Sequence, residues 1–363
     1  MADDRQRYQM TASGDEIAQL RAVVQDFLRS NLPMSAVRTA GEKGTFDTRA
    51  WRSLSDSLGL TGIGIPEELG GAGHSFRELG VVLEEFGAAL APVPLLSSAV
   101  AAAAVLAGDE GEPRAALLPG LAGGRTIAAP WFGAGLVVTG EGLVHGRAGH
   151  VPDGAHADVF VLAATDPGSP DDEMLLVVDA DTSGVSVQAL NALDPTRPIA
   201  AVRFDGAAST VLGRGAALME RARTVQQAAV ACEQVGGAAR CLEMIVDYAK
   251  TRHQFGAPIG SFQAVKHRCA DMLVELEAAR SIAYHLRDSL ADGDGEPGSA
   301  AAAAAWCSET YVHIAQETIQ LHGGIGFTWE HDAHLHVRRA RSDQLLYGTP
   351  RDHRRTLADL MGL

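Results

Sequence analysis

The spacing of hydrophobic residues divides the chain into three parts, and the first part has the period of helices. In residues 16–28, Ile17, Leu20 and Val24 fall three and four positions apart, as on one face of an amphipathic helix. Residues 51–58 repeat the pattern, and residues 60–73 form a turn rich in glycine and proline. Residues 75–90 then predict a third helix, with Ser75 as its N-cap and Glu78 three positions later.

The middle of the chain, from about residue 124 to residue 213, has the texture of strands. Short β-rich runs occupy residues 159–163, 174–178, 185–190 and 199–204. Glycine, proline and aspartate separate these runs, and the side chains in two of them alternate between apolar and polar. We therefore expect a small β domain.

The last part is helical again, and its helices are long. Residues 216–252, 261–290, 300–321 and 350–360 predict four helices, with a solvated loop at residues 291–299. Helices joined by short connections form bundles. The predicted fold is α+β and mostly α. It has an N-terminal helical domain in residues 1–123, a middle β domain in residues 124–213 and a C-terminal four-helix bundle in residues 214–363.

Composition excludes some partners and compartments. The net charge of -15 argues against nucleic acid or an anionic membrane as the main partner, although the local patch Arg338-Arg339-Ala340-Arg341 still allows an anionic ligand. The most apolar run, residues 99–107, is much shorter than the roughly 20 residues of a membrane span. The polar start Met1-Ala-Asp-Asp-Arg5 is not a secretory signal. We expect a cytoplasmic protein.

Four cysteines are scattered along the predicted helices without a Cys-x-x-Cys pair, namely Cys232, Cys241, Cys269 and Cys307. This usage is typical of reduced and mostly buried thiols in a cytosolic protein. We expect no metal site.

Two motifs in the last part carry the strongest functional signal. The first is Arg252-His-Gln-Phe-Gly, followed by a break at Gly256-Ala257-Pro258 and a new helix with Phe262 and Gln263. The second reads Gln-Leu-His-Gly-Gly-Ile-Gly-Phe-Thr-Trp-Glu over residues 320–330. Together they resemble the flavoprotein acyl-CoA dehydrogenase family, and the order of helical, β and bundle parts is similar to that family over nearly the whole chain.

The resemblance implies FAD as cofactor and an acyl-CoA thioester as substrate, with electron-transfer flavoprotein as the electron acceptor. It places Arg252 at the flavin pyrophosphate, often that of a neighbouring subunit, and Phe255 near the adenine. A guanidinium suits a diphosphate because it donates paired hydrogen bonds. The other residues that it assigns to the cofactor are Gln254, Gln263, Gln320, Gly323 and Gly324, the glycines by allowing close backbone approach.

The family's catalytic base is missing from both of its usual places. Tyr347 stands where many members carry a glutamate between the last bundle helices, and a phenol of pKa about 10 is a poor base at neutral pH. The alternative place, on the first bundle helix, holds Gln226. Glu233 lies two helical turns further along roughly the same face. Burial would raise its pKa toward the useful range, so Glu233 is either a catalytic base or a buried structural glutamate.

The middle part also departs from the family. Gly133-Ala-Gly-Leu and Ala148-Gly-His-Val occupy the stretches that contact the flavin in other members, so we expect few β-domain contacts to the chain's own flavin. These departures make the chain similar to one subunit of the heteromeric, steroid side-chain type acyl-CoA dehydrogenases of actinobacteria. The leading hypothesis is an α2β2 heterotetramer whose other chain supplies the base. The alternatives are a homo-oligomeric dehydrogenase that uses Glu233 and a catalytically silent scaffold subunit.

Overall fold

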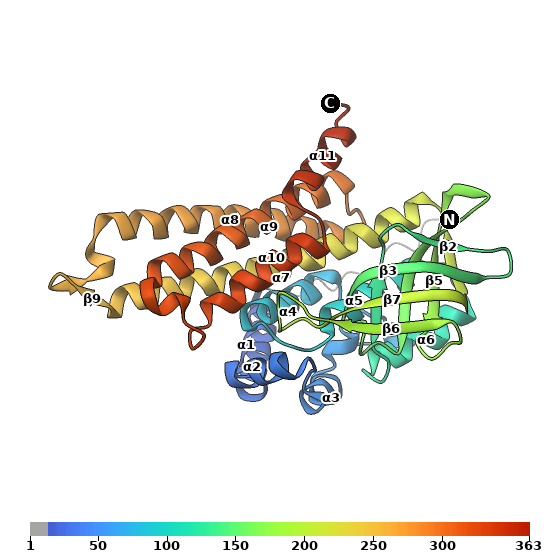
Figure 1. Cartoon of the computed structure of the whole chain (residues 1–363), viewed down its shortest axis with the longest axis horizontal. Helices are drawn as coiled ribbons and strands as arrows, with labels where there is room; N and C mark the ends of the chain where they lie inside the picture. The colour runs from blue at the N-terminus through green and yellow to red at the C-terminus, as the bar shows by residue number, and fades with distance from the viewer. Residues whose placement is uncertain (1–13) are drawn as a thin grey trace.

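The computed structural model describes residues 14–363, so Met1–Arg5, on which the absence of a secretory signal was inferred, lie outside it. Figure 1 shows a helical N-terminal part, a sheet at one end of the molecule, and long helices that extend from the sheet to the opposite end. The predicted α+β architecture is confirmed. The two proposed domain boundaries stay predictions.

Residues 14–123 of the N-terminal part form six helices and two short 3-10 turns. Ser75 caps α4 as predicted, because its hydroxyl accepts from a backbone N–H while the Glu78 carboxylate accepts from the Ser75 backbone. The pattern of apolar residues indicated α1, α3 and α4 but not the others. The elements are α1 (Gly14–Asn31), α2 (Met34–Lys43), α3 (Thr48–Asp56), η1 (Leu60–Gly62), η2 (Glu67–Leu69), α4 (Phe76–Ala89), α5 (Leu95–Ala107) and α6 (Glu112–Ala122).

The middle part is one mixed sheet of eight strands. Its order is β6-β7-β3-β2-β4-β5-β8, and β1 pairs in parallel with β4. The four predicted strands correspond to β4–β7. Phe160 and Phe204 meet edge to face in its core, with ring centroids 5.9 Å apart. The strands are β1 (Ala128–Trp131), β2 (Leu136–Val138), β3 (Leu143–Pro152), β4 (Val159–Asp166), β5 (Ser169–Asp179), β6 (Val185–Leu190), β7 (Ile199–Ala208) and β8 (Thr210–Arg214).

The C-terminal part has five helices rather than the predicted four. The additional helix is α10, whose many arginine and histidine residues hide its helical period. The helices are α7 (Ala216–Thr251), α8 (Gln263–Ala291), α9 (Pro297–His322), α10 (Ala333–Leu346) and α11 (Pro350–Leu360). Between them lie the small hairpin β9 (His253–Gln254) and β10 (Ala257–Pro258), and the 3-10 turns η3 (Ile259–Ser261) and η4 (Gly323–Phe327).

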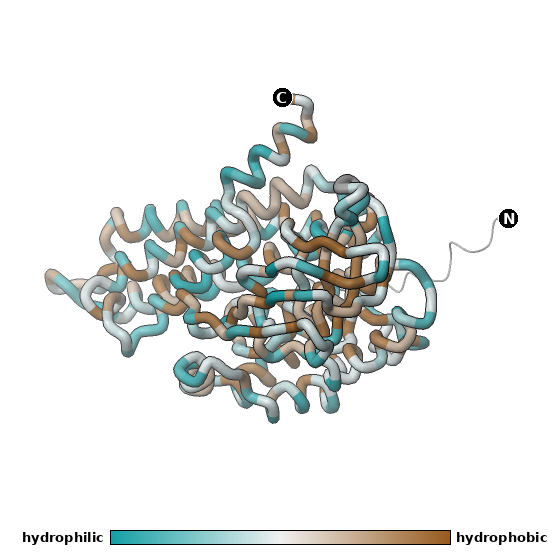
Figure 2. The backbone as a smooth tube through the Cα atoms, turned by 45° about the vertical axis from the view of Figure 1, so that its right-hand side comes forward, coloured by the Kyte–Doolittle hydropathy of each residue, from teal (hydrophilic) through white to brown (hydrophobic). Residues whose placement is uncertain are grey.

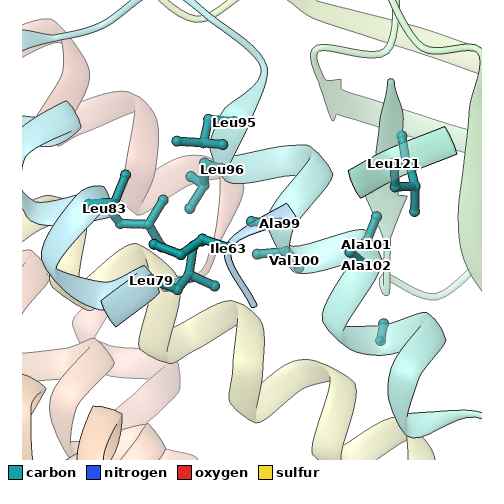
Figure 3. Close-up of a cluster of buried hydrophobic side chains, with 14 of the residues drawn as sticks. Ile63, Leu79, Leu83, Leu95, Leu96, Ala99, Val100, Ala101, Ala102 and Leu121 are labelled. Atoms are coloured by element: carbon teal, nitrogen blue, oxygen red, sulfur yellow. The ribbon is translucent and has the colours of Figure 1, made fainter. Parts of the chain in front are cut away.

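Helix α7 joins the three parts. Its 36 residues span about 54 Å, and Figure 1 shows it running from beside the sheet to the β9 hairpin. Ala229 and Val230 of α7 belong to the same buried core as the α4 and α5 side chains. Figure 3 shows Leu79 and Leu83 of α4 close to Ile63 and to the apolar face of α5. The neighbouring α7 residues Ala228 and Ala231 instead belong to the core of the bundle.

Apolar residues are concentrated inside this assembly. In Figure 2 the brown, hydrophobic positions gather in the sheet and along the helix contacts, and teal positions lie mainly on outer turns. Within residues 14–363, no helix is both long and apolar enough to cross a membrane. The four cysteines are free thiols, and three of them are buried.

Two glycines allow α4 and α7 to pack backbone to backbone. A Cβ atom on Gly236 would lie well inside 3.0 Å of the Glu84 carbonyl oxygen, and one on Gly87 would meet the Glu233 carbonyl in the same way. Since both obstacles are backbone atoms, neither can move aside by a rotamer change. This contact therefore fixes how the N-terminal helices sit on the bundle.

We expect Gly236→Ala to lower the free energy of unfolding by about 3 kcal/mol, because the added methyl group forces the two helix backbones apart. Urea unfolding followed by circular dichroism measures the change. Gly298→Ala in α9 is the matched control, since its added methyl has only one neighbour, 3.9 Å away at Leu357. Equal unfolding midpoints for the two variants would contradict this interpretation of the crossing.

Candidate functional site

The first group of predicted cofactor residues lies on the turn after α7. Arg252 caps this helix with its backbone N–H, which donates to the Tyr248 carbonyl at 2.8 Å, and its own carbonyl accepts from Ile259. Phe255 and Gly256 have positive φ angles of 54° and 80°, which produce the sharp turn. The Phe255 side chain is 92% exposed as a result. The hairpin thus projects its side chains away from the bundle.

Gln263 begins α8 on the other side of the same hairpin. The rings of Phe255 and Phe262 meet edge to face at 6.1 Å, which ties the hairpin to this helix start. The amide of Gln263 lies 3.3 Å from the His267 ring nitrogen. Arg252, Gln254 and Gln263 are all exposed, so their polar groups are available to a ligand.

The second group lies at the end of α9. Gly323 ends the helix with a φ of 63°, and its N–H donates to the Gln320 carbonyl. A Cβ atom on Gly323 or Gly324 would meet no atom within 4 Å, so the backbone here faces open space. The rings of Tyr248 and His322 stack with centroids 4.4 Å apart. This stack holds the end of α9 against the end of α7, so the two motifs share one end of the bundle.

The chemistry of these groups fits the cofactor that the sequence implies. A guanidinium suits a diphosphate, side-chain amides suit a nucleotide, and an open glycine backbone allows a ligand to approach closely. All of the predicted side chains are exposed at this end of the bundle.

A second constellation, which the sequence analysis did not identify, lies buried where the three parts meet. We call the side chains of Asp194, Arg197, Glu233, Arg339 and Asp343 the ion cluster. Arg339 donates to Glu233 at 2.7 Å and to Asp194, and Arg197 donates to Asp343 at 2.7 Å and to Glu233. The residues come from the β6–β7 connection, α7 and α10, so the cluster links the sheet to the bundle.

The ion cluster contains three acids and two arginines, and the pKa values of Asp343 and Asp194 shift in opposite directions. Burial raises the pKa of Asp343 well above its usual range, and the neighbouring Glu233 adds to that shift. The second oxygen of Asp343 has no hydrogen-bond partner among the described residues. Burial alone would raise the pKa of Asp194 too, but ion pairing with Arg339 outweighs it and lowers that pKa. Asp343 therefore keeps a proton more easily than Asp194 does.

This geometry bears directly on the predicted base. Both carboxylate oxygens of Glu233 accept hydrogen bonds from guanidinium groups, and the side chain is buried. Each carboxylate oxygen is thus engaged by at least one guanidinium group. A catalytic role for Glu233 thus gains no support from the structure, and the alternative of a buried structural glutamate fits its contacts.

Tyr347 and Gln226 occupy the two positions where the family usually carries its base. Tyr347 lies close to the ion cluster, and Gln226 lies on the same helix as Glu233. The Arg197 guanidinium is 5.8 Å from the centre of the Tyr347 ring, and burial raises the Tyr347 pKa further, so its phenol stays protonated. Gln226 is half-buried on α7. Glu233 is 19 residues from Arg252, which corresponds to about 28 Å along α7. The predicted base and the predicted cofactor residues therefore do not meet within one chain.

The stretches that replace the family's flavin contacts are part of the sheet. Gly133 lies in the short connection between β1 and β2, and Ala148 is fully buried within β3, where it pairs with Val202 of β7. Their place in the sheet leaves open which ligand contacts they make. The predicted scarcity of flavin contacts stays a prediction.

The expected basic patch is not one surface. Arg339 is buried in the ion cluster, whereas the Arg338 guanidinium lies over the Trp329 ring at 4.5 Å. The sequence did contain one signal of the ion cluster. Arg339 and Asp343 follow Leu335 at intervals of four residues, so these charged side chains share a helical face with a buried leucine. Among the described residues, no group of histidine, cysteine and acidic side chains could hold a metal ion.

Comparison with known families matches both helical parts of the chain. The model described as acyl-CoA dehydrogenase, N-terminal domain, matches residues 14–125. The model described as acyl-CoA dehydrogenase, C-terminal domain, matches residues 213–362.

Similar proteins match at nearly full length. Acyl-CoA dehydrogenase IpdE2 of Mycolicibacterium smegmatis is 37% identical over 93% of this chain and 96% of its own length. Acyl-CoA dehydrogenase FadE34 of Mycobacterium tuberculosis is 38% identical over 82% of this chain, which corresponds to 40% of that longer protein. Among solved structures, the ChsE4–ChsE5 complex of Mycobacterium tuberculosis has a chain with a TM-score of 0.90 at 25% identity, covering 97% of this chain and 98% of that one. A Tcur3481–Tcur3483 steroid ACAD variant gives 0.89 at 29% identity, covering 96% and 98%.

Proposed function

The chain belongs to the acyl-CoA dehydrogenase family of oxidoreductases that act on CH–CH bonds, and we propose that it is one subunit of a heteromeric, FAD-dependent member. The enzyme oxidises the α,β-bond of an acyl-CoA thioester. This chain contributes one side of the cofactor site, and a second family chain contributes the catalytic base.

One observation carries this proposal. The predicted cofactor residues lie exposed at one end of α7, and Glu233, the acid proposed as base, lies about 28 Å away and is fully occupied by Arg197 and Arg339. A base must come within about 3 Å of the proton that it removes. This separation supports our proposal that a second chain completes the site.

The relatives support the same assembly. One similar solved structure is a complex of two named chains, ChsE4 and ChsE5, and another is described as a steroid ACAD. We propose by this similarity an α2β2 heterotetramer that acts on a steroid-derived CoA thioester. We also propose a cytoplasmic location and electron transfer to electron-transfer flavoprotein, in line with the family resemblance.

Within the proposed site, FAD when bound supplies the hydride acceptor. The residues of this chain would bind and orient it. The Arg252 guanidinium would neutralise the pyrophosphate, and the amides of Gln254, Gln263 and Gln320 would donate to the nucleotide. Gly323 and Gly324 would leave room for its close approach, and Phe255 would lie near the adenine. The proton at the substrate α-carbon goes to a carboxylate of the second chain.

We expect Arg252→Ala to weaken FAD binding by the co-expressed complex about 10- to 100-fold, because a charge-assisted hydrogen bond contributes about 1.5–3 kcal/mol. Flavin absorbance per mole of purified complex measures the occupancy. Lys250→Ala is the matched control, since Lys250 is a nearby exposed cation that already pairs with Asp247. Unchanged flavin content in the Arg252 variant would contradict a role of this arginine in the cofactor site.

A second candidate is a catalytically silent scaffold subunit. The hydrogen bonds from Arg197 and Arg339 to Glu233 also favour this candidate. The same experiment separates the two functions. A scaffold would assemble with its partner, yet Arg252→Ala would leave the flavin content of the complex unchanged.

A further inference from the structure

The sheet of the middle part ends on one side in an unprotected strand, β6. This strand reads Val-Ser-Val-Gln-Ala-Leu over residues 185–190, and β7 is its only strand partner within residues 14–363. The four middle residues of β6 are all exposed. The strand has no charged residue and no proline, and its register with β7 runs without a shift. Edge strands of natural proteins usually carry a charge, a proline or a bulge, because these features prevent pairing with another chain.

Half of the β6 backbone groups point away from β7. The Asp205 N–H donates to the carbonyl of Gly184, which lies directly opposite it, so every second residue from Gly184 onward bonds to β7 in this antiparallel ladder. The N–H and C=O groups of Val187 and Ala189 therefore point out of the sheet. Outside the ladder, no backbone group of residues 14–363 bonds to these two residues.

The apolar core of the sheet also reaches this edge without a cover. Val187 pairs with Val202, and Val185 pairs with Phe204, so the two β6 valines lie on the core face. Val202 and Phe204 are buried in the sheet core, whereas Val187 is 41% exposed. A further strand beside β6 would bury the Val187 side chain and extend this apolar layer.

The opposite edge of the sheet, β8, is protected by the chain itself. β8 ends in the charged residue Arg214, and its pairing with β5 contains a register shift. The Leu212 carbonyl accepts a hydrogen bond from the Asp109 N–H, 2.6 Å away in the connection between α5 and α6. In the part of the chain that the structure describes, one edge is thus covered and the other is open to pairing.

We propose that the β6 strands of two copies of this chain pair antiparallel and join their two sheets into one. A second copy fits because the edge is complementary to itself. In a twofold arrangement centred on Val187, the outward N–H of each Val187 meets the carbonyl of the other, and the Ala189 N–H meets the Val185 carbonyl. Neither β6 strand carries a charge, so the strands bring no like charges face to face.

This contact lies apart from the proposed cofactor site. Figure 1 shows β6 on the sheet at one end of the molecule and the β9 hairpin at the other. The inference therefore does not rest on the proposed function, and β6 pairing leaves the cofactor end free for a partner chain. One short strand forms a small interface, so we expect the two copies to associate reversibly.

The test compares two exposed valines on the two edges of the sheet. Val187→Lys places two positive charges opposite each other at the centre of the paired strands, and we expect it to raise the dissociation constant of self-association about tenfold. Val211→Lys in β8 is the matched control. Val211 is 37% exposed on the covered edge, so we expect a change below about twofold. Sedimentation velocity of the full chain over a dilution series measures the constants, and thermal unfolding shows that each variant keeps its fold.

Val187→Pro tests the backbone part of the contact. It removes an N–H that points out of the sheet but no hydrogen bond to β7, and proline is tolerated at such edge positions. Because each copy loses one donor, we expect the dissociation constant to rise about 10- to 100-fold.

Three results would overturn the inference. The first is a wild-type chain that stays monomeric up to about 1 mM, and the second is an equal effect of Val187→Lys and Val211→Lys on self-association. The third is a chain that is monomeric alone while Val187→Lys weakens its assembly with a co-expressed family chain, since the edge would then belong to that other chain. Flavin content keeps this inference separate from the proposed function, because we expect Val187→Lys to leave it unchanged in the complex and Arg252→Ala to lower it.

Discussion

Purified without a partner, the chain is expected to oxidise acyl-CoA thioesters about 10²- to 10⁴-fold more slowly than when it is co-expressed with a family chain that has an intact catalytic glutamate. Loss of a general base has this typical cost. Tyr347 stands at one of the family's base positions and keeps its proton, because burial raises its pKa further. Gln226, at the other position, has no basic group. Dye-coupled turnover of both preparations measures the ratio.

Glu233→Gln identifies the source of any remaining activity. If Glu233 is structural, the co-expressed complex keeps its turnover per folded molecule, although its stability falls. Brisk oxidation by the chain alone, abolished by Glu233→Gln with the fold intact, would instead show a homomeric enzyme that uses Glu233 as its base. The heteromeric proposal would then be wrong.

The second large effect is expected at the ion cluster. Replacing Arg339 by methionine should lower the free energy of unfolding by about 3–5 kcal/mol, the cost of breaking a buried ion pair from one side. Arg339 is 2% exposed and donates to Asp194, Thr196 and Glu233. Its removal leaves Asp194 buried without a guanidinium partner, because Arg197 donates to Glu233 and Asp343 instead. Denaturant unfolding at neutral pH measures the loss.

Arg354→Met is the control for this experiment. Arg354 pairs with Glu309 on the surface, where both side chains are about half exposed, and such pairs contribute at most about 1 kcal/mol. If the two variants unfold at the same denaturant concentration, the cluster does not hold the sheet to the bundle. We expect the Arg339 variant to lose more free energy of unfolding. If the slope of that free energy against denaturant concentration is unchanged, the loss reflects a change in stability rather than in the compactness of either state.

Local rules made much of the fold predictable from the sequence. The Ser75 and Glu78 capping box was recognisable because its two residues are only three positions apart. The period of apolar residues marked α1, α3 and α4. The long helices α7, α8 and α9 were equally clear. The two motifs at Arg252 and Gly323 could be placed on helix ends before the structure showed that Tyr248 and His322 stack between them.

The ion cluster could not be predicted in this way, since it depends on contacts between distant segments. Arg197 reaches Asp343 across 146 positions of sequence, and no local pattern records such a pair. Helix α10 escaped notice for a related reason. Its buried face uses Arg339 and Asp343 where helical periodicity requires apolar residues, so the amphipathic signal disappears at the positions that form ion pairs with other segments. The role of Glu233 became clear only when both of its arginine partners were known.

The shared core of α4 and α7 also has a consequence for biosynthesis. The apolar face of α4 is completed by Ala229, Val230 and their neighbours on α7, which the ribosome adds more than 120 residues later. At about 5–20 residues per second this delay is roughly 7–30 s. During that time the face of α4 that packs on α7 lacks its partner. The growing chain is therefore a natural client for ribosome-associated chaperones, and fragments that end before α7 are expected to aggregate.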